Sequence, residues 1–201
     1  MPSIQDEVQL VPLCIDEELV KCSQHKREVC SECNADYTAQ NSLYRALKQT
    51  NGQVPPPNSV HPVLGTQITK LKDEGNQKYR AGQHEEAVRL YTLAIDMSYA
   101  RPLWEPHMFV REELSVLLGN RAAAYLAMGD FVKAYVDAEI AIRAKPPYSK
   151  AHFRKGKALL GLKRYQEAIQ AFEIGLQVDP KSDELQKGLK EAKELLGSKD
   201  E

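Results

Sequence analysis

Five polar side chains recur at related positions of a helical pattern, and together they could hold a negatively charged ligand. They are Lys72, Asn76, Asn120, Lys150 and Arg154. Two pairs among them, Lys72 with Asn76 and Lys150 with Arg154, are spaced four residues apart, so each pair projects from one face of a helix. Lysine and arginine supply positive charge, and asparagine supplies directed N–H groups without adding repulsion. These donors suit a peptide that ends in aspartate, because its last residue carries two neighbouring carboxylates.

A 34-residue repeat is what would bring these side chains together. The segments Ser115–Tyr148 and Ser149–Ser182 have this length and align residue by residue, with small residues and a final proline at the same places. A third segment of the same kind begins at Ile68. Small residues recur where two helices cross closely, and proline recurs where the second helix ends. The sequence therefore predicts three helix-turn-helix units, with turns at 81–82, 128–130 and 162–164.

Within these units all five polar residues fall on the first helix, which lines the inner surface of such an array. The final stretch, 182–196, has apolar residues at helical spacing among lysines and glutamates and ends before Gly197. We expect it to form a helix that covers the last apolar face of the array.

The period, the small residues and the prolines resemble the tetratricopeptide repeat family over residues 68 to about 196. The resemblance implies an all-α fold, an α-solenoid of three helix-turn-helix repeats plus a C-terminal capping helix, preceded by a small N-terminal element. The five polar residues match the carboxylate clamp of tetratricopeptide co-chaperones. That match implies binding to the C-terminal Glu-Glu-Val-Asp tail of cytosolic DnaK-type or ninety-kilodalton heat-shock chaperones.

The alternative is that these residues are ordinary solvated charges on a helical surface. Two asparagines inside helices, where their propensity is mediocre, speak against it. The neighbouring cations Arg121 and Lys155 fit the solvated alternative better. Lys157 could flank the groove, although solvation is the simpler expectation for it too.

The chain divides into a small N-terminal element (1–50), a proline-rich linker (51–66) and the repeat domain (67–197). The linker contains four prolines, at positions 55, 56, 57 and 62. In the N-terminal element, Val8–Ile15 alternates weakly as a strand and Ser42–Lys48 favours a short helix. The element is too small for a large core of its own, so we expect it to dock on the repeats, on a partner or on a metal.

An insertion interrupts the repeat pattern around residues 99–111 and contains the chain's single tryptophan, Trp104. Its apolar residues either pack on the adjoining helices or form a contact for a partner. The insertion, the short chain and the N-terminal element resemble the small soluble repeat subunits of fungal complexes for post-translational translocation into the endoplasmic reticulum. This implies an adaptor on the cytosolic face of that membrane, held by a membrane-anchored subunit, that recruits chaperones with their precursor proteins. A soluble cytosolic co-chaperone and a structural scaffold subunit are the alternatives.

Cys22, His25, Cys30 and Cys33 form a C-x2-H and a C-x2-C pair, which are chelating pairs of the types that zinc prefers. The spacer between the pairs is shorter than in ordinary zinc ribbons and fingers. The alternative is a set of reduced, partly buried cysteines beside a surface histidine. The pattern leaves zinc binding open and assigns no metal or other cofactor.

Composition excludes several function classes. A net charge of −1 gives no general attraction to nucleic acid. No run of about 18 apolar residues is present, so we expect no direct membrane insertion. The five histidines show no spacing that suggests a shared catalytic site, and no glycine-rich phosphate loop occurs. The sequence therefore predicts a cytosolic binding protein, peripheral on the membrane through a partner, and not an enzyme.

Overall fold

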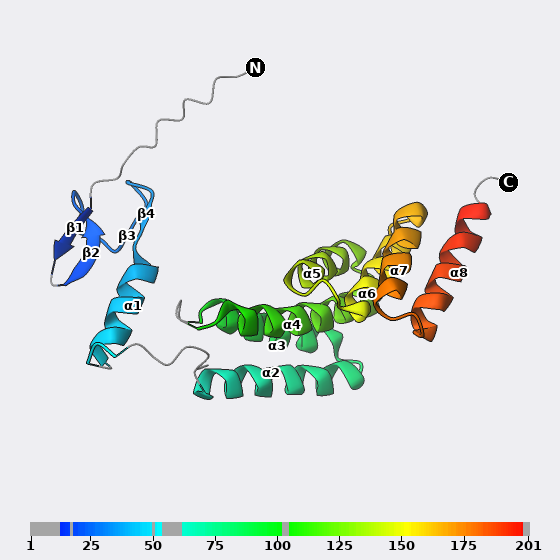
Figure 1. Cartoon of the computed structure of the whole chain (residues 1–201), viewed down its shortest axis with the longest axis horizontal. Coiled ribbons are helices and arrows are strands. Elements are labelled where there is room, and N and C mark those ends of the chain that lie inside the picture. The colour runs from blue at the N-terminus through cyan, green and yellow to red at the C-terminus, as the bar shows by residue number, and fades with distance from the viewer. Residues whose placement is uncertain (1–12, 17, 50, 54–61, 102–104, 199–201) are drawn as a thin grey trace, which may run out of the picture. The chain divides into compact units, whose positions relative to one another are not determined.

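The computed structural model describes residues 13–16, 18–49, 51–53, 62–101 and 105–198 (Figure 1). The described residues before position 60 belong to one compact unit and those after it to a second. We refer to them as the N-terminal unit and the repeat unit.

The N-terminal unit contains two small antiparallel sheets and one helix. Strand β1 (Leu13–Asp16) pairs with β2 (Leu19–Cys22), and β3 (Val29–Cys30) pairs with β4 (Ala35–Asp36). The end of the strand predicted at Val8–Ile15 is thus present, and the rest of it lies outside the described residues.

Helix α1 (Thr38–Gln49) is longer than the short helix predicted at Ser42–Lys48. It begins at Thr38 because the side chain of Asp36 accepts a hydrogen bond from the Thr38 N–H at 2.8 Å. Asn41 anchors α1 to β2, since its amide donates to the Val20 carbonyl and accepts from the Val20 N–H, both at 2.8 Å.

The repeat unit is all-α, as predicted. Three antiparallel helix pairs are followed by one further helix. Their bounds are α2 (Pro62–Arg80) with α3 (His84–Tyr99), α4 (His107–Ala127) with α5 (Phe131–Ala144), α6 (Ser149–Gly161) with α7 (Tyr165–Val178), and α8 (Asp183–Gly197).

The turn inside each pair contains one residue of positive φ. These residues are Gly82 (φ 76°), Gly129 (φ 77°) and Lys163 (φ 59°). The second and third are 34 residues apart, so the repeat period extends to the backbone conformation of the turn. The turns lie where the sequence predicted them.

The first and third repeats place a glycine of the first helix against an aromatic residue of the second. A Cβ on Gly75 would lie 2.6 Å from the ring of Tyr91, and one on Gly156 would lie 2.4 Å from the ring of Phe172. Both aromatic side chains are buried. Glycine thus recurs here because the ring of the paired helix occupies the space of a side chain.

The last helix, α8, covers the third repeat as predicted. Leu185 and Ala192 are buried in the same apolar cluster as Phe172. The helix begins after Ser182, whose hydroxyl accepts a hydrogen bond from the Leu185 N–H.

One segment differs from the sequence-based expectation, and the structure defines the conformation of part of another. Helix α2 begins at Pro62, so the end of the segment 51–66 that we predicted as a linker is helical. Part of the insertion 99–111 is also helical, because α4 begins at His107. Trp104 lies outside the described residues. Met108 and Phe109 are 68% and 44% exposed, so neither side chain is buried against the adjoining helices.

A buried ion cluster joins the end of α3 to α4. Arg101 contacts Glu105 Oε2 through Nη1 at 2.5 Å and Glu113 Oε1 through Nη2 at 2.9 Å. The side chains of Arg101 and Glu105 are 4% and 0% exposed. Ser98 adds a hydrogen bond to Glu113 at 2.7 Å. The start of the insertion is therefore held by paired buried charges.

Candidate functional site

A chain of polar contacts crosses the three first helices of the repeat unit. Helix α4 contacts both α2 and α6. Asn120 on α4 donates through Nδ2 to Asn76 Oδ1 on α2 at 3.1 Å, and its Oδ1 lies 3.5 Å from Arg154 Nη2 on α6. The structure thus brings together three of the five predicted residues, one from each repeat.

The orientation of the Asn76 amide is fixed by its neighbours. Its Oδ1 accepts from Asn120 and also from the Tyr91 hydroxyl at 2.8 Å. Burial raises the pKa of Tyr91 to about 12, while the nearby positive charge of Arg154 acts in the opposite direction. The phenol therefore stays protonated and donates. With its oxygen occupied by two donors, Asn76 keeps its Nδ2 hydrogens for a ligand.

Arg154 has a free charge. Its only hydrogen bonds among the described residues are long: Nη2 to Asn120 Oδ1 and Nη1 to the Tyr148 hydroxyl, both at 3.5 Å. None of the described carboxylates forms an ion pair with it. Gly119 leaves room for the guanidinium, since a Cβ there would lie 2.5 Å from Nη1. Arg154 is therefore available to bind an anion in a planar, two-point manner.

The two lysines are less tightly placed. Lys72 Nζ lies 3.5 Å from Asp73 Oδ1, and its side chain is 30% exposed. Lys150 is exposed, and it has no ion pair within the described part of the chain. Each lies one helical turn before a member of the polar chain, Lys72 before Asn76 and Lys150 before Arg154. Neither is joined to that chain by a hydrogen bond, so their part in the site stays a prediction.

The neighbouring cations have partners of their own. Lys157, which we expected could flank the groove, forms an ion pair with Glu191 of α8 at 3.0 Å. Lys155 pairs with Glu139 at 2.7 Å. Arg121 pairs with Asp137 through both sides of its guanidinium, at 2.7 and 2.8 Å.

These contacts set the three cations apart from Arg154. Their charges are balanced within the repeat unit, and they hold helices together instead of facing solvent alone. The expectation of simple solvation was wrong for Arg121, whose side chain is 17% exposed.

Sequence reasoning missed the two tyrosines of the site. The Tyr91 hydroxyl donates to Asn76 Oδ1, and the Tyr148 hydroxyl accepts from Arg154 Nη1. One signal existed for the first: the third repeat has Phe172 at the position of Tyr91, so the hydroxyl is an addition that the core does not need.

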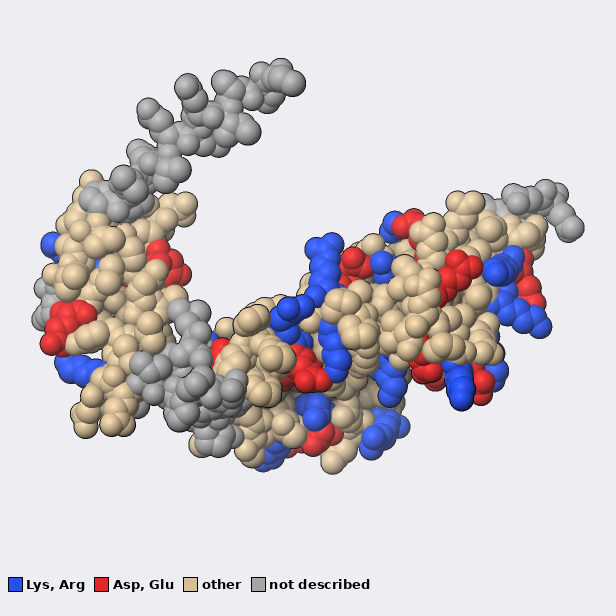
Figure 2. Space-filling model, in the orientation of Figure 1, with Lys and Arg blue, Asp and Glu red and all other residues tan. Residues whose placement is uncertain are grey.

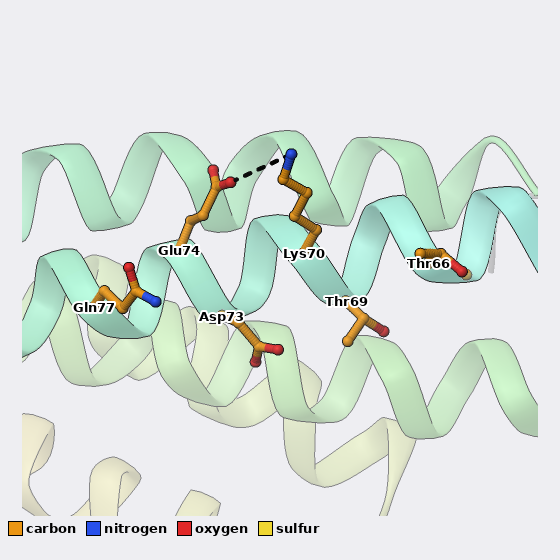
Figure 3. A pocket seen from close by; sticks show the side chains of 7 residues that line it. Thr66, Thr69, Lys70, Asp73, Glu74 and Gln77 are labelled. Carbon is orange, nitrogen blue, oxygen red and sulfur yellow. Dashed lines mark ion pairs between the residues drawn. The ribbon is translucent and has the colours of Figure 1, made fainter.

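The visible face of the repeat unit carries charges of both signs. Figure 2 shows lysines and arginines interspersed with acidic residues over the visible face of the repeat unit. An open pocket runs along α2, and the residues lining it all belong to that helix (Figure 3). Lys70 and Glu74 pair there at 3.9 Å. Because a single helix lines it, this depression is not the predicted site.

No helix in the described ranges combines the length and the apolarity needed to cross a membrane.

Comparison with known proteins finds the third repeat at the boundaries predicted from the sequence. The family model of the tetratricopeptide repeat matches residues 149–182. The chain is 40% identical over 121 residues to the "ER protein translocation subcomplex subunit sec67" of Schizosaccharomyces pombe, covering 60% of this chain and 63% of that protein. It is 36% identical over 129 residues to the "heat-shock protein cognate (HSC) co-chaperone sgt12" of Aspergillus fumigatus, covering 63% of this chain and 34% of that protein.

The chain therefore spans less than two thirds of the length of these curated relatives. A solved structure aligns more completely. It is the second TPR domain of human RPAP3 in complex with the HSP70 peptide SGPTIEEVD. That domain is 31% identical, with a TM-score of 0.56, and the alignment covers 65% of this chain and 98% of the domain. The chain belongs to the tetratricopeptide repeat family.

Proposed function

We propose that the repeat unit is a receptor for the C-terminal tail of a heat-shock chaperone. The observation that carries this proposal is the chain Asn76–Asn120–Arg154, which joins all three repeats and ends in a cation without an acidic partner among the described residues. A tail that ends in aspartate would place two carboxylates against these donors. The related RPAP3 domain, whose structure contains a peptide ending in EEVD, supports the choice of ligand.

Lys72 and Lys150 would complete this carboxylate clamp. Both project from the same first helices, one turn before Asn76 and Arg154, and Lys150 is exposed. A flexible lysine can reach a carboxylate oxygen that the fixed amides do not meet. Because the cations are accessible to solvent, we expect a micromolar affinity that falls as salt is added.

The proposed setting is the cytosolic face of the endoplasmic reticulum. The relative in Schizosaccharomyces pombe is a subunit of an ER protein translocation subcomplex, which supports this location. There the chain would be held by a membrane-anchored subunit and would recruit DnaK-type chaperones that carry precursor proteins. Holding a weakly bound chaperone near the channel raises the local concentration of its client. In this proposal the chain binds and positions other proteins and catalyses no reaction.

A soluble co-chaperone for DnaK-type or ninety-kilodalton chaperones is the second candidate, and the relative sgt12 favours it. A scaffold subunit that binds an internal segment of a partner is a third. Cell fractionation distinguishes the adaptor from the soluble co-chaperone. An adaptor sediments with membranes, and it should no longer do so when its membrane-anchored partner is removed. Indifference to the peptide's C-terminal carboxylate would favour the scaffold.

A double-mutant cycle tests the clamp. The wild-type chain and Arg154→Ala are each titrated by calorimetry with a Glu-Glu-Val-Asp peptide that has either a free or an amidated C-terminus. We expect Arg154→Ala to weaken binding of the acid peptide by about 1–3 kcal/mol, the scale of a charged hydrogen bond. Lys72→Ala should have an effect of the same size. Amidation should cost the wild type at least as much and should cost Arg154→Ala less.

Arg89→Ala is the matched control, because Arg89 is an exposed arginine on the second helix of the first repeat and should leave the affinity unchanged. Thermal unfolding of each variant shows that the repeat unit is intact. Equal affinity of the wild type for the acid and the amide peptide would rule out the clamp.

Tyr91→Phe tests how the site is oriented. The substitution removes the hydrogen bond to Asn76 Oδ1 and keeps the ring that packs on Gly75. The Asn76 amide can then turn, so we expect peptide binding to weaken by about 0.5–1.5 kcal/mol. The same titration measures it. Tyr99→Phe, at a position 62% exposed, should have no effect. An unchanged affinity of Tyr91→Phe would show that the hydroxyl does not prepare the site.

A further inference from the structure

The N-terminal unit has almost no apolar core. Among its described residues, the buried side chains are Cys22, Cys30 and Asn41. None of its larger described apolar side chains is fully buried: Leu13 is 57% exposed, Ile15 is 74% exposed, and Leu19, Val20, Leu43 and Leu47 are partly buried. Units of this size rarely fold on apolar burial alone and rely on disulfides, metals or partners. The two buried cysteines are therefore the first place to look for what holds this unit together.

Four side chains converge on one point in this unit. The Sγ atoms of Cys22, Cys30 and Cys33 and a ring nitrogen of His25 all lie within 4.8 Å of one another. His25 Nδ1 is 3.7 Å from Cys22 Sγ, and it is 3.4 Å from each of Cys30 Sγ and Cys33 Sγ. Cys22 Sγ and Cys33 Sγ are 3.3 Å apart.

These separations match a tetrahedral metal site. Bonds of about 2.3 Å to sulfur and about 2.0 Å to nitrogen place tetrahedral ligand atoms roughly 3.5–3.8 Å apart. Four of the six pairs lie 3.3–3.7 Å apart, close to that range, and the other two pairs lie within 4.8 Å. A disulfide needs its sulfurs about 2.05 Å apart, and the cysteines of the described residues are free.

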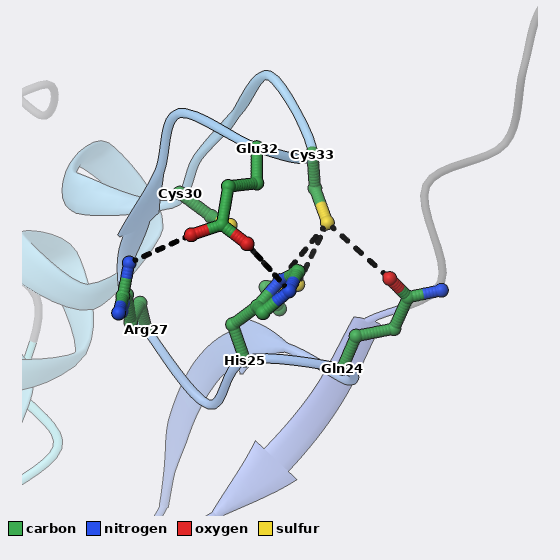
Figure 4. A network of polar contacts seen from close by, with 7 residues as sticks. Gln24, His25, Arg27, Cys30, Glu32 and Cys33 are labelled. Atoms are coloured by element: carbon green, nitrogen blue, oxygen red, sulfur yellow. Dashed lines mark hydrogen bonds and ion pairs between the residues drawn. The ribbon is translucent and has the colours of Figure 1, made fainter.

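The histidine is also oriented as a metal ligand requires. Its second ring nitrogen, Nε2, lies 2.8 Å from Glu32 Oε2, and Glu32 Oε1 lies 3.3 Å from Arg27 Nη1 (Figure 4). A carboxylate on the far nitrogen of a histidine fixes the tautomer that leaves the near nitrogen free to bind a metal. The contact between Glu32 and His25 is thus a second observation that points to a metal, since a cluster of reduced cysteines would not require it.

The backbone presents each pair of ligands in the same way. Cys22 and His25 form the first pair, and Lys26 follows it with φ at 55°. Cys30 and Cys33 form the second pair, and Asn34 follows it with φ at 48°. Residues other than glycine adopt this conformation seldom, so its recurrence after both pairs indicates two turns of one kind.

We propose that Cys22, His25, Cys30 and Cys33 bind one zinc ion that holds the N-terminal unit together. Three thiolates and one imidazole are a ligand set typical of structural zinc, and the protein fills all four positions, so none is left for a substrate. Glu32 orients His25 from outside the metal sphere. The ion takes the place of the missing apolar core, because metal binding supplies folding free energy directly.

The full chain, purified without a metal-binding tag, is analysed for metal by plasma mass spectrometry. We expect about one zinc ion per chain, lost in Cys33→Ser and in Cys30→Ser. Cys14→Ser is the matched control: Cys14 is the chain's remaining cysteine and lies outside the cluster, so this variant should keep its zinc. Circular dichroism of the repeat unit's helices shows that a variant has lost metal and not its whole fold.

Two further measurements do not depend on removing a ligand. Cobalt added to the apo wild-type chain should give the visible absorption of a tetrahedral thiolate site. Glu32→Gln should weaken zinc affinity about 10–100-fold in competition with a chromogenic chelator. Metal content far below stoichiometric in the wild type, or equal loss in Cys14→Ser and Cys33→Ser, would overturn the proposal. So would a wild-type chain whose intact mass shows a disulfide among these cysteines.

Discussion

Replacing Phe172 with alanine should lower the free energy of unfolding of the repeat unit by about 3–5 kcal/mol. Its side chain is fully buried between the third repeat and α8. Glycines surround it: Cβ atoms on Gly156 and Gly188 would lie 2.4 and 2.7 Å from its ring. Because these two neighbours have no side chains to move into the space, alanine would leave a cavity on their side of the ring.

Chemical denaturation followed by circular dichroism measures this difference. The matched control is Phe109→Ala, the same substitution at a position 44% exposed, which should change stability little. If both variants unfold at the same denaturant concentration, the conclusion that burial of Phe172 stabilises the last repeat is wrong.

Arg101→Met should destabilise the repeat unit by about 3–5 kcal/mol, because it leaves buried carboxylates without their cation. Glu105 is 0% exposed at its side chain, and Glu113 is 22% exposed. Methionine fills much of the volume of arginine, so the loss reflects charge more than packing.

Arg164→Met provides the comparison for charge. Arg164 pairs with Glu167 at 2.6 Å, a distance close to that of the Arg101 pair, but the two side chains are 45% and 50% exposed. An exposed pair contributes about 0–1 kcal/mol. Thermal or chemical unfolding distinguishes the two variants. Equal effects would show that burial adds nothing to the Arg101 cluster.

The repeat architecture could be predicted because it depends on residue types that recur at a fixed spacing. Gly156 and Phe172 recur as Gly75 and Tyr91, and one period predicts both the crossing of helices and the turns. The limits of the repeat region were less predictable. Helix α2 starts at Pro62, because proline, which we used as a sign of a linker, is also well suited to the first position of a helix.

The sequence predicted three side chains that the structure brings together, Asn76, Asn120 and Arg154, but not the hydrogen bonds around them. A spacing of four places Lys150 and Arg154 on one face, but it does not show that Lys157 is already paired with Glu191 of α8. Nor does it show that a hydroxyl of the core, that of Tyr91, fixes the orientation of the Asn76 amide. Such contacts join residues distant in sequence, and their geometry depends on how the helices pack.

The cysteine cluster could also be predicted only in part. The two chelating pairs are visible in the sequence, but their closeness depends on backbone conformations at Lys26 and Asn34 that residue type alone does not require.

The polar chain from Asn76 through Asn120 to Arg154 takes one member from each repeat. The stability of arrays of this kind is close to the sum of the stabilities of neighbouring units, so one terminal repeat can unfold while the others stay folded. Such a partly folded state would lack one member of the chain and would bind a tail poorly. A bound tail therefore favours the state in which all three repeats are folded, and it would raise the cooperativity of unfolding as well as the stability.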